Sequence, residues 1–463
     1  MKGFFILFMC SVFVSSEIYS QNILNVRSLS MGNTSASSSY ELDAFNQNPA
    51  NILNQRLNKK SAVYFNILTN AGVLTSSNFL SLNFYNNYFG EVNNGQGRAL
   101  TEDDKQTILR DASDQPSRIF VSARLLSFVL NTKKSGSYGI SIDERFSEKI
   151  KVSRDFLNVG LFGNLINSTY NLSGSENNTY WVRQINLTYA NSLSFKNNKT
   201  FDELAFGVSV KPQLGLYYLN TRSNDLMVTT NNFNQIQGSG SAEFLYSGLT
   251  NDNNFKYSLD NAGFGVGFDA GINARIKNVS RNGYLNLGLS ITDIGFIKWD
   301  KNTANYFYDG NFLITDITNR AQLDSLKDKI KATKTSVTSF TTTLPTTVRF
   351  GASYKFTSSA SKSSLKKEIA TIAVDYVQGF NEDLGGSKKP SGGIGGEYNI
   401  TDVILSRIGF GFGGLQDFAV SLGLGINAGP VIFDIGTYNV ESIFKPKGTT
   451  KFSAGLNIKF KIN

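Results

Sequence analysis

The sequence predicts an all-β protein, a transmembrane antiparallel β-barrel of about 14 strands with an N-terminal lumen plug and short helical loop inserts. Three observations predict it. The composition has 42 Gly, 36 Phe and 20 Tyr among 463 residues but only 7 Pro, which suits many strands and tight turns. Long segments alternate between apolar and polar residues. No stretch reaches the roughly 18 consecutive apolar residues of a membrane-spanning helix.

The C-terminal segment 452–462 shows the alternation most clearly. One face of this expected strand carries Phe452, Ala454, Leu456, Ile458, Phe460 and Ile462. The pattern recurs at 264–273, 285–292, 408–413 and 418–427. A β-sandwich also alternates, but strands of about 10–14 residues and a Gly-rich polar face with scattered charges favour a barrel around a wet or plugged lumen.

The upstream strands are less regular than those near the C-terminus. They are expected at 61–69, 78–88, 117–131, 136–144, 181–195, 203–218 and 238–248, and the stretch 217–237 is compatible with either a loop or a continuous strand. Together with seven or eight downstream strands they predict about 14, with 12 and 16 as alternatives. With a periplasmic C-terminus, the long connections 296–345 and 378–392 become extracellular and most short turns periplasmic.

Two helical inserts are expected in the connections. Thr101 and Asp104 form an approximate capping box ahead of an apolar run. A charged segment from about Thr318 to Lys334 places Leu323, Leu326 and Ile330 on one helical face. The second segment falls in the long external loop and is expected to form a short helix over the barrel mouth, with a docking site for a partner as the alternative.

Residues 1–20 are predicted to be a signal peptide. Lys2 supplies the positive charge, an apolar run follows from Phe4, and Ser20 is a small residue before the expected cleavage point. The mature chain is then divided into a plug segment, 21–60, and the barrel, 61–463. The expected location is the outer membrane of a Gram-negative cell.

Missing residue types exclude several kinds of chemistry. The chain has no His and a single Cys, Cys10, so His-based hydrolase machinery, His-ligated metals and disulfides are excluded. The acidic pairs at 103–104 and 382–383 lack the apolar context of an acid–base catalyst. Gly263, Gly265 and Gly267 only loosely imitate a nucleotide-binding loop, because strand alternation continues through them. We therefore expect no enzyme activity, no cofactor and no metal.

The N-terminal segment suggests a family. Residues 21–60 are small and polar and are expected to fold into the lumen. The segment carries Ser30, Gly32 and Ala36, then Ala44-Phe45 and Asn48-Pro49-Ala50, and a long run of amphipathic strands follows. In these features the chain resembles the FadL-type outer-membrane barrels, and more closely their Bacteroidota relatives, including PorV-like proteins and an uncharacterised barrel family. The segments LPTTVRFGASYKF, GFGVGFDAGINARI and NGYLNLGLSITDIGFIKW are similar to that uncharacterised family.

The resemblance implies two alternative functions. Similarity to FadL implies a barrel plugged by its N-terminus that passes hydrophobic molecules and releases them sideways, with Gly32, Asn48, Pro49 and Ala50 in the plug. Similarity to PorV implies a barrel that binds other envelope proteins in a type IX secretion context. The leading prediction is a plugged channel for small or hydrophobic molecules. The alternative is a non-transporting adaptor or scaffold that holds partner proteins through its extracellular loops.

Charged residues supply the remaining predictions. The lumen face is expected to be mostly Gly, Asn, Ser and charge, with a salt-bridge network that holds the plug. The candidates for this network are Asp269, Arg275, Arg349, Glu397, Arg407 and Asp434. The net charge of +9 is scattered, which argues against nucleic acid. Lysine pairs at predicted turns are expected to be solvated, and for the external residues Lys388, Lys389, Lys445 and Lys447 attraction to lipopolysaccharide phosphates is the second interpretation. Lipid and lipopolysaccharide are the expected partners, with envelope proteins as possible partners.

Overall fold

The computed structural model of the protein describes residues 23–53, 62–92, 96–97, 99–132, 135–195, 200–231, 235–248, 261–280, 282–315, 333–358, 367–414 and 417–462. The predicted signal peptide lies outside the described residues. So does most of the predicted helix at 318–334, whose last two residues belong instead to a short strand, β14.

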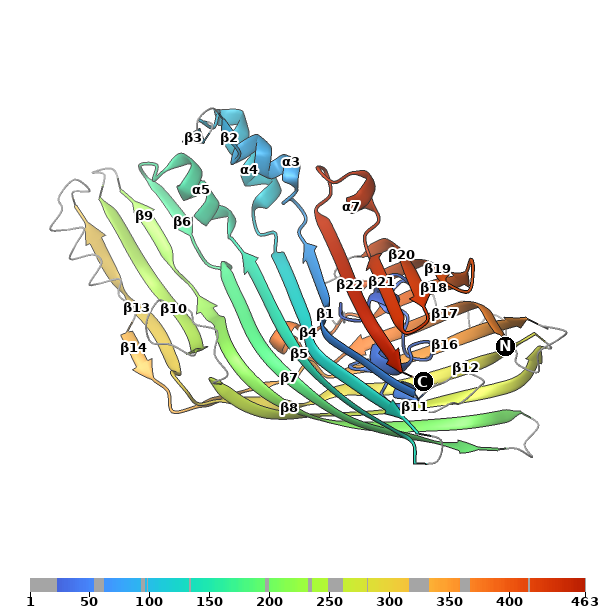
Figure 1. Ribbon diagram of the computed structural model, residues 1–463. Helices are drawn as coiled ribbons and strands as arrows, with labels where there is room; N and C mark the ends of the chain where they lie inside the picture. The colour runs from blue at the N-terminus through green and yellow to red at the C-terminus, as the bar shows by residue number, and fades with distance from the viewer. Residues whose placement is uncertain are drawn as a thin grey trace, which may run out of the picture.

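Fourteen antiparallel strands form a closed barrel, as predicted (Figure 1). Each pairs with the next along the chain, and β1 pairs with both β4 and β22, which closes the wall. The wall strands are β1 (Ala62–Ser76), β4 (Ser117–Asn131), β5 (Ser137–Lys151), β7 (Glu176–Ser194), β8 (Phe201–Asn224), β11 (Gly263–Ser280), β12 (Gly283–Trp299), β16 (Thr347–Ser358), β17 (Lys367–Gly379), β18 (Ser391–Asn399), β19 (Ile404–Gly413), β20 (Phe418–Ala428), β21 (Val431–Thr437) and β22 (Lys451–Ile462).

The barrel is apolar outside and polar inside. Phe350 is 52% exposed, whereas the preceding residue, Arg349, is 1% exposed. Ile408 and Arg407 show the same contrast in β19, at 49% and 4%. This is the reverse of a water-soluble protein, and it matches a wall with lipid on one side and an enclosed interior on the other.

Exposed aromatic side chains gather near both ends of the wall. Toward one end lie Phe264, Tyr376, Phe412, Phe418 and Phe452, and toward the other lie Tyr138, Phe201, Phe356 and Tyr398. Aromatic residues prefer the two interfaces of a bilayer, so these two groups mark the boundaries of the membrane-spanning band.

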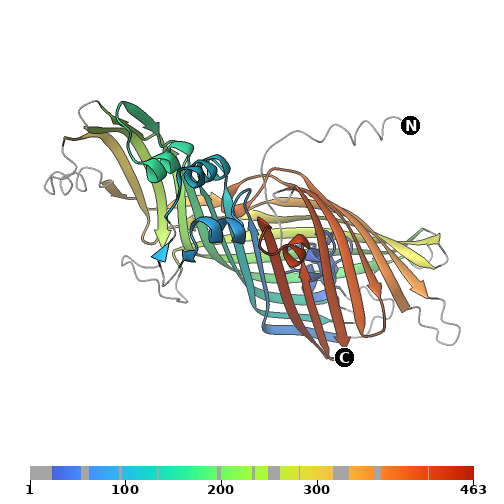
Figure 2. The same ribbon diagram turned by 90° about the horizontal axis from the view of Figure 1, so that it is seen from above.

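The two ends of the barrel differ strongly (Figures 1 and 2). One end, here the turn end, carries the short connections such as Gly429-Pro430 and the C-terminus. The other, the loop end, carries all the long connections. This division agrees with the loop pattern expected from the sequence. None of the described helices is long and apolar enough to cross a membrane.

The loop end bears two structured parts. One is a group of helices formed by α3 (Leu82–Tyr88), α4 (Glu102–Ala112) and α5 (Arg154–Phe162), near the hairpin β2 (Glu91–Val92) and β3 (Gln96–Gly97). The other is the projecting sheet, which leans away from the barrel and consists of β6 (Ser168–Asn171), β9 (Met227–Thr230), β10 (Ile236–Gly248), β13 (Ala304–Ile314) and β14 (Thr333–Ser336). The strand β15 (Phe340–Thr343) pairs with β12, and α7 (Glu441–Phe444) lies in the connection between β21 and β22.

Four upstream predictions can be compared with the structure. The capping box is confirmed, because Thr101 accepts from the Asp104 amide and Asp104 accepts from the Thr101 amide at the start of α4. The strand expected at 78–88 is wrong, because Ser81 caps the helix α3 there. The strand at 238–248 exists as β10 but belongs to the projecting sheet. The stretch 217–237 begins as a continuation of β8 to Asn224 and then turns into β9.

Candidate functional site

Residues 23–53 lie inside the barrel and form the centre of the candidate site. Nearly all of them are buried. Asn25 begins the short helix α2 (Val26–Leu29), where its side chain accepts from the Ser28 amide. Asn48 likewise begins η2 (Pro49–Ile52) by accepting from the Ala50 amide, with proline at the first helical position. The side-chain caps thus satisfy backbone amides that have no sheet partner, and proline has no amide hydrogen that needs one.

A buried chain of charges joins this N-terminal segment to the last strands of the wall. Arg27 donates to both carboxylate oxygens of Glu397 at 2.9 and 3.0 Å. Arg407 bridges Glu397 and Asp434 at 2.7 and 2.6 Å. The chain continues through Lys459, which lies 2.8 Å from Asp434 and 2.7 Å from Asp43 of the segment. The network therefore starts and ends on the N-terminal segment.

Arg27 remains charged in this setting. Burial opposes its charge, but Glu397 and the Tyr40 ring more than compensate, so the pKa of Arg27 lies above its ordinary value. The guanidinium also stacks over Tyr40, 4.8 Å from the ring centre, and donates to the Ser38 carbonyl at 2.7 Å. The bidentate geometry fixes its direction as well as its distance.

Other strands hold the segment on further sides. Asn273 of β11 donates to the Asn51 side chain at 2.7 Å. Arg124 of β4 donates to the Leu42 carbonyl at 2.9 Å, and its guanidinium pairs with Asp143 at 2.7 Å. Asp375 of β17 accepts from two successive backbone amides, those of Ser35 and Ala36, both at 2.6 Å. Contacts on β4, β11 and β17 in addition to β18–β22 mean that the segment spans the lumen.

Glycines of the wall make room for the segment. A Cβ on Gly288 would lie 2.1 Å from the Ala36 carbonyl oxygen, and one on Gly207 would lie 2.3 Å from the Pro49 backbone. Gly32 of the segment has a φ of +66°, and its own Cβ would lie 2.5 Å from the Phe410 carbonyl oxygen. Only glycine permits both the backbone angle and the close approach at this position.

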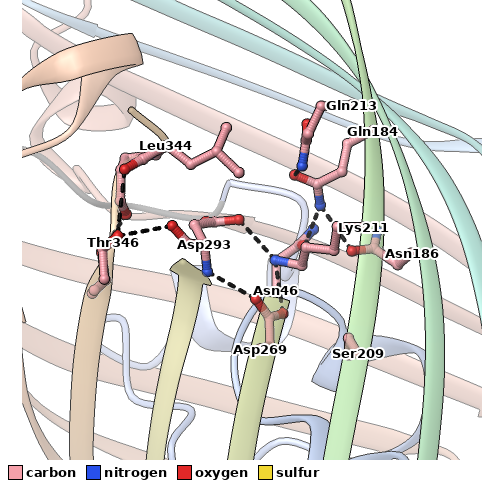
Figure 3. Close-up of polar contacts among 12 residues, drawn as sticks. Asn46, Gln184, Asn186, Ser209, Lys211, Gln213, Asp269, Asp293, Leu344 and Thr346 are labelled. Carbon is pink, nitrogen blue, oxygen red and sulfur yellow. Dashed lines mark hydrogen bonds and ion pairs between the residues drawn. The ribbon is translucent and has the colours of Figure 1, made fainter. Parts of the chain in front are cut away.

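A second polar cluster lies nearer the loop end (Figure 3). Lys211 of β8 is fully buried and pairs with Asp269 at 2.7 Å and Asp293 at 2.8 Å. Arg145 approaches Asp293 at 3.7 Å. Asn46 of the N-terminal segment accepts from Gln184 beside this cluster. The wall charges here neutralise one another.

The six predicted network residues are therefore distributed over several groups. Glu397, Arg407 and Asp434 belong to the chain that reaches the N-terminal segment. Asp269 belongs to the Lys211 cluster. Of the two remaining residues, Arg275 pairs with Glu203 at 3.5 Å, apart from both groups. Arg349 interacts electrostatically with Asp375 and with Asp293 of the Lys211 cluster.

Sequence reasoning missed several members of these groups. They are Arg27, Asp43, Arg124, Lys211, Asp293 and Lys459. The charge of Lys459 was visible on the polar face of the last strand. Arg27 and Asp43 could not be paired with distant strands from sequence spacing. Among the described residues, no group of three acidic or cysteine side chains could hold a metal ion.

An apolar cluster occupies the loop-end mouth, where the sequence suggested only a polar lumen. Trp299 and Ile297 are fully buried there, and Tyr218 and Leu384 are each 7% exposed. The Trp299 ring stacks with Phe340 of β15 at 6.2 Å between centroids. This aromatic mouth cluster also includes Tyr180, Val182, Leu245, Ala262 and Leu344.

Two bulges explain why these side chains point inward. In β12, Thr292 and Asp293 together oppose the single residue Asp269, and Asp293 has a φ of +58°. In β8, Leu216 has no partner in β7, because Trp181 pairs with Tyr217 and Val182 pairs with Gly215. Beyond each bulge, toward the loop end, side chains that would otherwise face outward face the interior. Ile297 and Trp299 of β12 and Tyr218 of β8 are therefore buried inside the barrel.

A short loop covers the aromatic mouth cluster. Leu384, in the turn η3 (Asp383–Gly385), inserts into the cluster with a φ of +47°, an uncommon angle for leucine. A Cβ on the next residue, Gly385, would lie 2.5 Å from the Tyr180 hydroxyl. Strain of this kind persists only where surrounding packing enforces it.

Comparison with known proteins gives a family and several similar folds. A family model described as "Family of unknown function (DUF5723)" matches residues 49–430. No curated protein sequence matches the chain. Similar solved structures include a deletion mutant of the TodX monoaromatic hydrocarbon channel, with 11% identity, coverage of 96% of this chain and 98% of that chain, and a TM-score of 0.46.

Two further structures belong to the same type of barrel that the sequence resembled. The toluene transporter TodX of Pseudomonas putida is 10% identical, with coverage of 96% and 97% of the two chains and a TM-score of 0.44. A FadL homologue of Pseudomonas aeruginosa is 11% identical, with coverage of 97% and 99% and a TM-score of 0.37. The fold assignment for this chain rests on its own strand pairing.

Proposed function

Because the chain belongs to the DUF5723 family, described as a family of unknown function, we propose its function from its own geometry. The protein is an outer-membrane channel for small apolar molecules that is closed at rest by residues 23–53. The observation that carries the proposal is the arrangement of the interior. An aromatic cluster lies at the loop-end mouth, and behind it residues 23–53 cross the lumen, held by hydrogen bonds and ion pairs.

The contacts of the segment suit a removable closure. Many of them are hydrogen bonds and ion pairs to wall strands on several sides of the lumen. Water can replace such bonds when the segment moves, so the net cost of release is far below the sum of the individual bonds. At the wall glycines, no side chain stands in the path of the segment.

The aromatic mouth cluster suits the first binding step for an apolar solute. It is buried, rich in flat rings, and covered by Leu384 on a loop that is not part of the wall. Displacement of this loop would expose Trp299 and Tyr218 to a solute from the loop end. Burial of the solute's apolar surface would then supply the affinity.

The closure is tested by deletion of residues 23–53. In planar bilayers the deletion variant is expected to conduct continuously, whereas the full-length protein stays mostly closed. Uptake tests the mouth cluster with toluene as the probe: Phe340→Ala should lower uptake several-fold. Phe307→Ala, which alters an exposed ring of the projecting sheet, is the matched control. An unchanged conductance in the deletion variant, with the barrel still heat-modifiable in gels, would refute the channel.

The second candidate function is a non-transporting adaptor, PorV-like and secretion-associated. The projecting sheet favours it, because Met227, Phe307 and Leu313 are 44%, 40% and 54% exposed on strands that stand clear of the wall. Unchanged toluene uptake in a deletion strain would favour this function, provided that defined envelope proteins co-purify in mild detergent and are lost with Phe307→Ser and Leu313→Ser.

The proposed location requires removal of residues 1–20. Intact-mass measurement of the protein purified from outer membranes should give a chain that starts at Gln21. A chain that retains Met1, or a protein recovered in the inner membrane, would contradict this location.

A further inference from the structure

The helix α3 carries a second apolar face that its own packing does not use. Phe84 is buried against Tyr88 and the neighbouring helix α4. Leu82, Tyr85 and Phe89 are 48%, 52% and 49% exposed. Their spacing of three and four residues places them together on one side of the helical turn.

The loop between β21 and β22 exposes a similar group. Ile443 and Phe444 of α7 are 60% and 75% exposed. Lys445 and Lys447 follow directly, and both are exposed as well. An apolar pair is thus followed at once by two positive charges.

The two loops run side by side. The final strand pair, Ser76 with Lys451, is followed by a bond from the Ser77 amide to the Thr450 carbonyl at 3.0 Å. Further out, the Asn83 amide donates to the Lys447 carbonyl at 2.7 Å. Both views show α3 next to α7 (Figures 1 and 2).

The backbone bonds place the exposed apolar residues of the two loops near one another. We call them together the loop-end apolar patch: Leu82, Tyr85, Phe89, Ile443 and Phe444, with Lys445 and Lys447 at its border. Scattered exposed apolar residues are normal, but several large ones together mark a contact with a membrane or a partner.

Position and charge indicate which contact this is. Phe452 and Leu456 of β22, which begins just after this loop, are 41% and 40% exposed on the lipid-facing side of the wall. The patch is therefore continuous along the chain with the lipid-facing band. Its basic border matches an anionic amphiphile, which has acyl chains beside phosphate groups.

We propose that the loop-end apolar patch binds lipid A of lipopolysaccharide in the outer leaflet. Ile443, Phe444 and the exposed face of α3 contact acyl chains, and Lys445 and Lys447 contact the lipid A phosphates. This inference rests on the outer-membrane location proposed above. It assigns the role of a lipid anchor to the connection that joins the last two strands.

Single cysteines test the contact, because Cys10 is the only cysteine of the chain. In a Cys10→Ser background, Phe444→Cys is labelled with a fluorophore in vesicles of brominated phosphatidylcholine and lipid A. Leu456→Cys on the wall is the positive control, and Leu313→Cys on the projecting sheet is the negative control. We expect bromine quenching at 456 in all vesicles and aqueous iodide quenching at 313. At 444 we expect bromine quenching without lipid A, and a clear loss of this quenching when lipid A displaces the brominated lipid.

The three positions separate the two proposals. In vesicles without lipid A, quenching by bromine at 456 but not at 444 would overturn the patch and leave the membrane barrel intact. Absence of bromine quenching at 456 would overturn the membrane barrel itself. Quenching at 444 that is equal with and without lipid A would assign the patch to phospholipid and overturn the lipid A contact.

The basic border has its own measurement. One lysine beside an anionic lipid surface contributes roughly fivefold in binding, so Lys445→Gln with Lys447→Gln should weaken binding of lipid A vesicles about 30-fold. Glu441→Gln changes an exposed carboxylate of the same helix α7 and should not weaken it. Equal binding by the double variant and the unmodified protein would overturn the role of the lysines.

Discussion

Replacing Glu397 by glutamine should loosen the N-terminal segment without opening the wall. Glu397 is the one carboxylate that bonds both Arg27 of the segment and Arg407 of β19. Glutamine keeps one acceptor oxygen but turns an amino group toward a guanidinium. Arg407 still has Asp434, at 2.6 Å, so the loss falls mainly on Arg27, which keeps the Ser38 carbonyl.

The size of the effect follows from burial. Arg27 and Glu397 are 2% and 7% exposed at the side chain, so solvent does not screen the pair. Removing one partner of such a buried pair costs about 3–5 kcal/mol. If the bonded segment loses about 3 kcal/mol of stability relative to the displaced segment, the fraction of molecules with a displaced segment rises about 150-fold.

Hydrogen exchange of the segment amides measures this population directly. In Glu397→Gln, amides within residues 25–47 should exchange about 100-fold faster, while wall amides keep their rates. The matched control is Glu176→Gln, which removes a pair to Lys149 at 2.7 Å whose side chains are 29% and 23% exposed and should change exchange only a few-fold. Segment rates within threefold of the unmodified protein would refute the role of the network.

Two further predictions concern local packing. Gly395→Ala places a Cβ 2.2 Å from the Met31 carbonyl oxygen, whereas the nearest atom to a Cβ on Gly396 lies 3.9 Å away. Gly395→Ala should therefore lower the stability of the closed state by about 1–3 kcal/mol and raise bilayer conductance. Gly396→Ala should change neither. Equal conductance in both variants would show that the segment does not rest on this wall. Thr101→Ala removes the α4 cap and should cost about 1 kcal/mol, seen as roughly fivefold faster exchange within α4 alone; unchanged exchange there would contradict the capping role.

Strand alternation was sufficient to predict the class of fold and the strand number. It could not distinguish a wall strand from a projecting one, because β10 has the same two-residue period as its neighbours in the wall. It also misread 78–88, where the spacing of Phe84 and Tyr88 fits one helical face and Ser81 is a capping residue. These two errors removed two of the seven strands expected upstream. The total of 14 still holds, because the downstream part has nine wall strands where seven or eight were expected.

The interior was harder to predict, for two physical reasons. Ion pairs within a hairpin can be inferred, since Arg407 lies directly opposite Glu397 in the β18–β19 register. The pair of Arg27 with Glu397 joins residues 370 positions apart, and no local pattern carries that information. The aromatic mouth cluster was missed because single-residue bulges at Asp293 and Leu216 reverse which face is interior, and alternation alone does not show where a bulge lies.

The bonds of the segment couple its folding to closure of the wall. Residues 23–53 precede the first strand, yet Arg27 and Asp43 pair with Glu397 and Lys459 near the C-terminus. The wall closes where the first strand, β1, pairs with the last, β22. The ion pairs of a segment that is synthesised first are therefore complete only when the strands that are synthesised last are in place.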